Sequence, residues 1–209
     1  MKNEYELCTR CLMDTSDPDI EFDEKGHCNH CRELLQMREH FQLDGSRKDR
    51  LEQIVTEIKE KGKGKNYDCI VGVSGGVDST YVAYLVTKLG LRTLAVHVDN
   101  GWNSELAVNS IEKVLKKLNI DLYTHVIDWE EFRQLQLAFL RASVSDAEIP
   151  TDHAIRAVLN RVAVQEKVQY VINGRNFFTE GILPWSWTYS ALDWKYIRCI
   201  NKRFGLKRL

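Results

Sequence analysis

A short glycine-rich stretch between an apolar run and a helical pattern constrains the fold more than any other part of this chain. The apolar run is Cys69–Val73, and the stretch that follows it is Ser74-Gly75-Gly76-Val77-Asp78-Ser79. Apolar and β-branched residues bounded by glycine are typical of a buried strand. A strand that feeds a helix through such a turn presents free backbone N–H groups, which bind phosphate. We therefore expect a phosphate-binding loop here, with hydroxyl donors at Ser74 and Ser79 and with Asp78 as a ligand of Mg²⁺.

Predicted strands and helices alternate along the rest of the chain. Further strands are expected at 92–98, 122–127 and 170–174, with helices between them. Asp128, followed three residues later by Glu131, has the pattern of a helix cap. The run Ile149–His153 is expected to open the next helix, with Thr151 or Asp152 explicable as its cap. This alternation predicts an α/β fold, a doubly wound parallel sheet, in which ligands bind beyond the carboxyl ends of the strands.

Four cysteines near the N-terminus form two Cys-x-x-Cys pairs. Cys8 and Cys11 are separated by sixteen residues from Cys28 and Cys31. The spacing predicts a zinc ribbon, in which four thiolates complete a tetrahedral Zn²⁺ shell and leave no position for a substrate. An iron–sulfur cluster and unrelated free thiols are the alternatives. The two histidines next to the second pair are expected at the surface.

Composition and charge narrow the classes of function. The chain has 209 residues and a formal net charge of −1, which gives no general attraction to nucleic acid or to an anionic membrane. No stretch resembles a signal peptide or a membrane span, so we expect a cytoplasmic protein with no membrane partner and no nucleic-acid partner. The tail after Asp193 is basic, and we favour a solvated helix over a phosphate-contacting surface there.

Three parts are predicted along the chain. They are a zinc ribbon at 1–33, a helical connector at 34–65 and a nucleotide-binding domain at 66–209. Lys61-Gly62-Lys63-Gly64-Lys65-Asn66 is the expected linker before the last part.

The Ser-Gly-Gly-Val-Asp-Ser stretch resembles the pyrophosphate-binding loop (PP-loop) of the N-type ATP pyrophosphatases, which include GMP synthetase, NAD synthetase and tRNA thiolases. It lacks the Gly-Lys-Ser/Thr ending of the kinase and GTPase loop. The resemblance implies that ATP is split into AMP and pyrophosphate, and that a substrate oxygen is adenylated before a nucleophile displaces AMP. It also places the adenosine at the end of the second strand, at Val98 and Asp99. For Asp99 an ordinary turn is the alternative.

Later residues are further candidates for this site. His153 and Arg156 lie one turn apart near a helix start, where they contact a ligand phosphate or are merely solvated. Gly174, followed by Asn176 and Glu180, resembles the Gly-x-Asn…Glu segment of ammonia-using synthetases, although the spacing is looser. The resemblance makes Gly174 a nucleotide-binding residue, and it implies contacts with ligand or ammonia for the other two. The implied catalytic residues are Asp78, Asp99, Asn176 and Glu180.

The cysteine ribbon, the run Ile149–Ile155 and the stretch from Tyr196 to Gly205 together resemble the N-acetyl sugar amidotransferase family, which acts in making lipopolysaccharide or flagellin sugars. The resemblance covers essentially the whole chain, and it implies that the family's C-terminal part is missing. It also implies ATP, Mg²⁺, structural Zn²⁺, a nucleotide-activated sugar whose acetamido group becomes acetamidino, and a separate glutaminase subunit that supplies ammonia. A tRNA thiolase and a nucleotide-binding module without catalysis are the competing interpretations.

Overall fold

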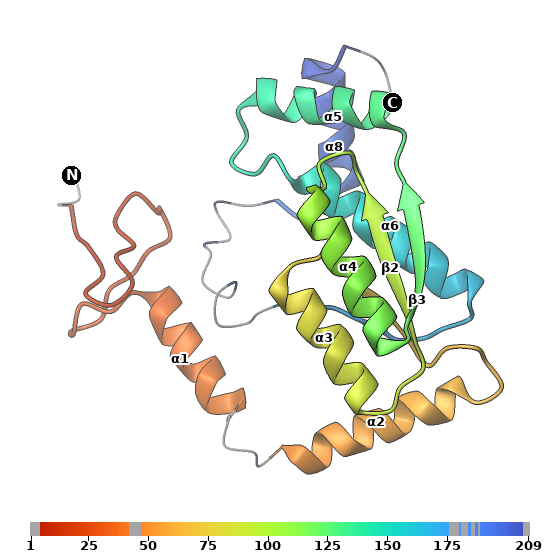
Figure 1. The fold of residues 1–209 in the computed structure, drawn as a ribbon. Coiled ribbons are helices and arrows are strands. Elements are labelled where there is room, and N and C mark those ends of the chain that lie inside the picture. The colour runs from red at the N-terminus through yellow and green to blue at the C-terminus, as the bar shows by residue number, and fades with distance from the viewer. Residues whose placement is uncertain are drawn as a thin grey trace. The chain divides into compact units, whose positions relative to one another are not determined.

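The computed structural model describes residues 5–41, 47–175, 180, 184, 187 and 189–206. Within them a four-stranded parallel sheet has the strand order β3-β2-β1-β4 (Figure 1). The strands are β1 (Cys69–Gly72), β2 (Thr93–Asp99), β3 (Asp121–Val126) and β4 (Val171–Ile172). The predicted parallel α/β sheet is therefore confirmed.

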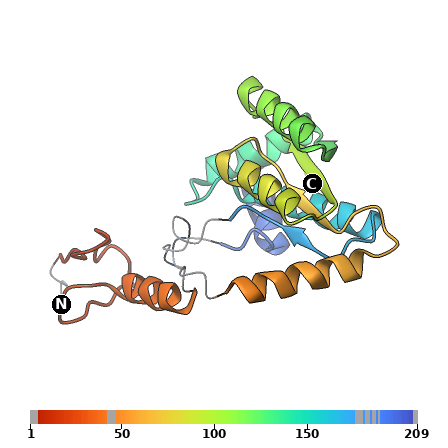
Figure 2. The same cartoon turned by 60° about the horizontal axis from the view of Figure 1, so that its bottom comes forward.

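Helices cover both faces of this sheet (Figures 1 and 2). On one face, Val71 and Ala95 pack in a core with α3 (Val77–Lys88), α4 (Glu105–Leu118) and Ile58 of α2 (Lys48–Gly62). On the other face, α6 (Ile149–Gln165) packs against the side chains that alternate with these along the strands. That second core contains Ile70, Leu94, Val96, Val158, Leu159 and Val162. Burial on both faces explains why β1 is an uninterrupted apolar run.

Two further helices lie beyond the carboxyl ends of β2 and β3 (Figure 1). They are α5 (Trp129–Ala142) and α8 (Trp194–Phe204), which share a small core built on Phe139, Ile149 and Ile197. The predicted cap of α5 is confirmed, because the Asp128 side chain accepts a hydrogen bond from the Glu131 N–H at 3.0 Å.

The N-terminal part contains α1 (Asn29–Phe41) and two isolated antiparallel bridges, Leu7 with Asp14 and Phe22 with Cys28. Contacts divide the chain into two compact units, one made of 1–51 and 176–189 and the other of 52–175 and 190–209. Most of α2 therefore belongs to the unit that holds the sheet.

Two expectations about helix starts are wrong. Thr151 and Asp152 lie inside α6, whose N-cap is Glu148 without a capping side chain, because the helix begins at Ile149 and places Pro150 in its first turn. The helix after the glycine-rich loop was expected from Ser79, but it begins at Val77, inside the loop sequence. Among the described residues, no helix is both long enough and apolar enough to cross a membrane.

Candidate active site at the carboxyl edge of the sheet

The loop between β1 and α3 is closed by hydrogen bonds among its own serines. The Ser74 N–H donates to Ser79 Oγ at 3.2 Å, and the two hydroxyl oxygens are also 3.2 Å apart. Ser79 Oγ lies 3.2 Å from the carbonyl oxygen of Gly76, which is the N-cap of α3 and provides no side-chain cap. The first N–H groups of a helix have no intrahelical partner, so those of α3 are available to an anion.

Two glycines of the site stand where no other residue fits. Gly75 has a φ of +78°, and a Cβ built there would lie 2.5 Å from the carbonyl oxygen of Ala107 in the first turn of α4. A Cβ at Gly174 would lie 2.9 Å from the Ser79 nitrogen in the first turn of α3. The structure thus brings the end of β4 and the start of α4 directly against the loop.

Asp78 and Val77 project from this loop. Val77 is 85% exposed, and the carboxylate of Asp78 has no hydrogen bond or ion pair with any described residue. A carboxylate without a protein partner, beside the uncapped N–H groups of a helix start, has the chemistry of a ligand for hydrated Mg²⁺.

The end of β2 lies next to the loop, as β1 and β2 are paired in parallel. Val98 is half-buried, and the Asp99 side chain accepts hydrogen bonds from the Gly101 N–H at 3.0 Å and from Asn103 Nδ2 at 3.1 Å. One carboxylate oxygen of Asp99 therefore holds the turn after β2. This contact agrees with the turn-forming alternative for Asp99.

A buried histidine that the sequence reasoning missed contacts the backbone immediately before the loop. His97 is 6% exposed, and its Nδ1 lies 3.0 Å from the carbonyl oxygen of Val73, the residue before the loop. A carbonyl only accepts, so Nδ1 carries the proton and donates. The only signal in the sequence is a polar residue within an apolar strand.

The remaining predicted residues are more dispersed. His153 Nδ1 lies 2.6 Å from the carbonyl oxygen of Ala191, and its ring stacks on Trp194 with centroids 5.9 Å apart. These contacts join α6 to the segment before α8, whereas Arg156 is exposed. Asn176 lies outside the described residues, and Glu180 is an exposed residue of the other compact unit.

The four cysteines of the two pairs come together as predicted, with all their sulfur atoms within 4.8 Å of one another. The Sγ atoms of Cys8 and Cys31 are 3.8 Å apart, and those of Cys11 and Cys28 are 3.5 Å apart. Zinc–sulfur bonds of about 2.3 Å in a tetrahedron separate the sulfurs by about 3.8 Å. The cluster therefore has the size of a site for a single tetrahedral ion.

Backbone N–H groups near this cluster favour the thiolate of Cys8, whereas burial raises the pKa of the Cys11 and Cys28 thiols. Burial raises the pKa of the Cys8 thiol, but the backbone N–H groups of Cys11, Arg10 and Cys28 outweigh it and lower that pKa to about 6. His30 was expected at the surface, but its side chain is 11% exposed, and Nε2 lies 2.7 Å from the buried carboxylate of Asp17. This contact fixes the position of His30, which lies between the two cysteines of the second pair.

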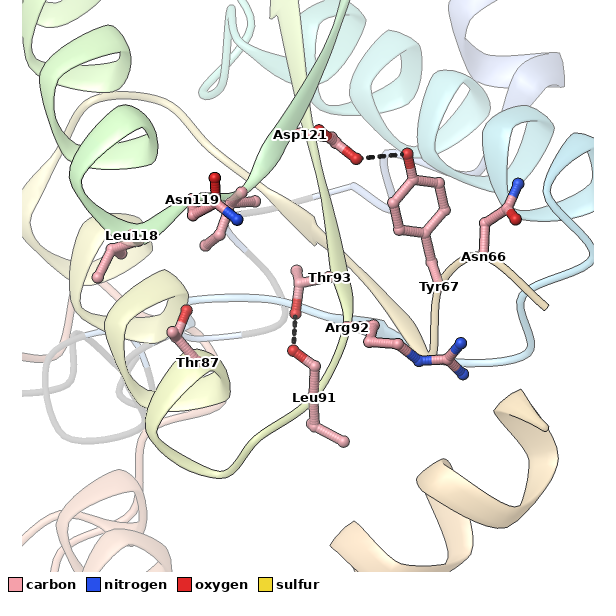
Figure 3. Close-up of a pocket in the computed structure, with 10 residues that line it drawn as sticks. Asn66, Tyr67, Thr87, Leu91, Arg92, Thr93, Leu118, Asn119 and Asp121 are labelled. Carbon is pink, nitrogen blue, oxygen red and sulfur yellow. Dashed lines mark hydrogen bonds between the residues drawn. The ribbon is translucent and has the colours of Figure 1, made fainter. Parts of the chain in front are cut away.

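A cavity of about 320 Å³ lies at the opposite, amino edge of the sheet (Figure 3). Two of its polar side chains are already bound within the protein: the Tyr67 hydroxyl donates to Asp121 at 2.9 Å, and Arg92 donates to Asp68, Gly62 and Lys65 outside the cavity lining. Few groups remain there to bind a ligand, so the carboxyl edge is the better candidate site.

Residues 68–180 match the family described as queuosine biosynthesis protein QueC, and this span is more than half of the chain. The chain belongs to the QueC family. The span shared with QueC contains the whole glycine-rich loop, β2 and the end of β4, but neither the cysteine pairs nor α8. Membership of this family places the chain among the PP-loop proteins, so the loop at 74–79 is called the PP-loop below.

Two kinds of curated relative are similar to this QueC-family chain. The GMP synthase [glutamine-hydrolyzing] of Pyrobaculum aerophilum is 35% identical over 109 residues, which are 50% of this chain and 20% of the relative. The tRNA(Ile)-lysidine synthase of Nitratidesulfovibrio vulgaris is 38% identical over 79 residues, which are 34% of this chain and 23% of the relative. The chain thus spans about a fifth of the length of these relatives.

Solved structures are similar at lower identity. The NH3-dependent NAD synthetase from Campylobacter jejuni gives a TM-score of 0.48 at 18% identity, covering 73% of this chain and 70% of the synthetase. The U34-tRNA thiolase NcsA from Methanococcus maripaludis, solved with its [4Fe-4S] cluster, gives 0.43 at 17% identity, covering 76% and 66%.

Proposed function

We propose that this chain is an ATP-dependent amidotransferase that adenylates the acetamido oxygen of a nucleotide-activated sugar and then replaces AMP by ammonia. The observation that carries the proposal is the PP-loop, where the uncapped N–H groups of α3 lie beside the hydroxyls of Ser74 and Ser79. To these donors we assign the β- and γ-phosphates of ATP. Binding these two phosphates as a unit prepares pyrophosphate as the leaving group.

Asp78 is the residue we assign to the metal at this loop. Its carboxylate has no partner among the described residues, which fits a ligand of Mg²⁺. The ion, when bound, offsets the negative charge on the departing pyrophosphate.

The chemistry needs two displacements, because an amide carbon is a poor electrophile. The amide oxygen attacks the α-phosphorus, and the bond to the bridging oxygen breaks, so that pyrophosphate leaves with the electron pair. Ammonia then attacks the carbon of the O-adenylated imidate and loses a proton. The carbon–oxygen bond breaks last, so AMP leaves with the former amide oxygen and an acetamidino group remains.

The positions of the remaining thiols support an external source of ammonia. Cys69 is fully buried in β1, where burial raises the pKa of its thiol, and Cys199 is exposed on α8. A glutaminase needs an accessible cysteine activated by a neighbouring base, and no described histidine bonds to either thiol. We therefore propose that a separate glutaminase subunit supplies the ammonia. The GMP synthase relatives are themselves named as glutamine-hydrolyzing enzymes.

For the cysteine cluster we propose one structural zinc ion, on the basis of the tetrahedral sulfur spacing. Metal analysis of the purified chain should find one zinc per chain. Cys11→Ser should lose most of it, whereas Cys199→Ser, which changes an exposed thiol outside the cluster, should keep it. Iron and acid-labile sulfide in place of zinc would contradict this assignment.

A tRNA-modifying enzyme of the same superfamily is a second candidate, and one observation favours it. Helix α8 exposes four basic side chains that have no ion pair with any described residue, namely Lys195, Arg198, Lys202 and Arg203. Such a face suits the phosphates of RNA.

Release of AMP from α-labelled ATP tests the proposal and separates it from this rival. With Mg²⁺ and ammonium, AMP should form when an acetamido nucleotide-sugar is present, but not with unmodified tRNA. Asp78→Ala should abolish it, whereas Asp49→Ala, an exposed aspartate in the first turn of α2, should not. AMP formation with tRNA alone would favour the rival, and ATP binding without AMP formation from any acceptor would indicate a binding module.

A further inference from the structure

The turn that follows β2 presents a large aromatic side chain to solvent at the carboxyl edge. Trp102 is 65% exposed, and its indole meets that of Trp129, at the start of α5, edge to face with centroids 5.4 Å apart. A ligand that covers an exposed tryptophan removes the apolar surface of the ring from water, which favours binding.

This turn is held rigidly by its own polar groups. The Asp99 carboxylate anchors Gly101 and Asn103, and the Asn100 side chain accepts from the Trp102 N–H at 3.1 Å. Gly101 has a φ of +81°, and a Cβ there would lie 2.5 Å from the Trp129 ring. The tryptophan is therefore held in place before any ligand arrives, which lowers the entropic cost of binding.

A buried glutamine fixes the indole from α5. Trp102 Nε1 donates to Gln136 Oε1 at 2.5 Å, and Gln136 Nε2 lies 3.5 Å from Thr151 Oγ1 in α6. Gln136 is only 8% exposed. Because the indole N–H is already satisfied by the protein, Trp102 offers a ligand the surface of its ring and not a hydrogen bond.

The position of this turn suits the base of a nucleotide bound at the PP-loop. On the β4 side, the backbone of Gly174 lies against the first turn of α3. On the β2 side, the turn leads into α4, whose Ala107 contacts Gly75 of the loop. Neighbouring strands lie about 4.8 Å apart, so the turn after β2 is within reach of a nucleoside attached to phosphates at β1.

We propose that Trp102 stacks on the base of the nucleotide whose phosphates bind the PP-loop, and that Gln136 is a positioning residue that holds the indole. The inference rests on the ATP-binding part of the proposed function and is independent of the acceptor. Ring stacking contributes affinity for a base through its face.

Calorimetric titration with two magnesium complexes, ATP and inorganic tripolyphosphate, separates the base from the phosphates. Trp102→Ala should weaken ATP binding about tenfold and leave tripolyphosphate binding unchanged. Trp102→Phe keeps a ring and should stay within about threefold of wild type, since most of the stacking surface remains. Leu106→Ala is the matched control, because Leu106 is 78% exposed in the adjacent first turn of α4 and should have no effect.

Gln136→Leu tests the positioning role in a double-mutant cycle. It should weaken ATP binding about threefold in the wild-type background and not at all when combined with Trp102→Ala. Unchanged ATP binding in Trp102→Ala, or an equal loss for ATP and tripolyphosphate, would overturn the assignment of Trp102. An undiminished effect of Gln136→Leu in the Trp102→Ala background would overturn the role given to Gln136. Failure of the wild type to bind either ligand would instead refute the proposed nucleotide site itself.

Discussion

At the amino edge of the sheet the charged and hydroxyl groups bind one another, whereas the carboxyl edge has a carboxylate and helix N–H groups that no described side chain binds. Arg92 donates to the buried carboxylate of Asp68 and to two backbone carbonyls, and Tyr67 donates to Asp121. At the other edge, Asp78 has no partner among the described residues, and the N-terminus of α3 has no side-chain cap.

The difference distinguishes groups that stabilise the fold from groups that await a ligand. A buried polar group that is hydrogen-bonded within the protein adds stability and has little capacity left for binding. The amino-edge cavity is therefore structural, although it is a real hollow in the surface. Changes at the amino edge should lower stability and leave nucleotide binding unchanged, whereas changes at the carboxyl edge should weaken nucleotide binding.

Gly75→Ala should have the largest effect. The new Cβ would collide with the Ala107 backbone at a φ of +78°, so the PP-loop must move, and AMP formation should fall more than a hundredfold. Gly64→Ala is the matched control, since its φ is +75° with nothing within 4 Å, and it should cost only about 1 kcal/mol of stability. Steady-state rates and urea unfolding measure both. Equal activity losses in the two variants would show that backbone strain, and not the contact with α4, is responsible.

Asp68→Ala should have the next largest effect, and it should lower stability without changing nucleotide binding. It removes the carboxylate to which three N–H groups of Arg92 donate, one of them in the backbone, and should lower the free energy of unfolding by about 2 kcal/mol. Its affinity for ATP should be unchanged. Asp121→Ala, which removes an exposed partner at the same edge, should cost less than about 0.5 kcal/mol. An ATP affinity that falls in Asp68→Ala would break the division between the edges.

The contribution of Asp68 should also depend on pH. Burial raises the pKa of this carboxyl, but the hydrogen bonds and charge of Arg92 outweigh it, so the pKa in the folded protein lies below the ordinary 3.8. The carboxylate therefore stabilises the fold above about pH 4, and the effect is lost as the pH falls through the folded pKa. The stability difference between wild type and Asp68→Asn should shrink from pH 7 to pH 3. A constant difference over that range would contradict the assigned cause.

His97→Leu should have the smallest effect. It removes the donor to the Val73 carbonyl just before the PP-loop and should raise the dissociation constant for ATP about threefold. His97→Asn keeps a donor near the position of Nδ1 and should recover most of that loss. If both variants bind ATP like wild type, the histidine supports the core and not the loop.

The sequence allowed the sheet, the PP-loop and the cysteine cluster to be predicted, because each depends on local patterns. The apolar run Cys69–Val73 requires burial on both faces, and Cys-x-x-Cys spacing directs thiolates to one point wherever it occurs. The glycines of the loop could also be predicted from a local pattern, because a tight turn requires glycine.

The rest depended on contacts between distant residues. Gln136 meets Trp102 across 34 positions, and nothing near either residue indicates the other. Thr151 was predicted as a helix cap from its neighbours, but the helix begins earlier and its hydroxyl is left to contact Gln136. His97 looked like any strand residue, because which face of β2 it occupies is decided by pairing with β1.

The most direct test of the central claim follows one oxygen atom. Acetamido nucleotide-sugars labelled with ¹⁸O in the amide carbonyl are incubated with ATP, Mg²⁺ and ammonium, and the AMP is analysed by mass spectrometry. Adenylation of the amide oxygen predicts AMP that carries the label and an acetamidino product that lacks it. Unlabelled AMP, or ADP in place of AMP, would contradict the account.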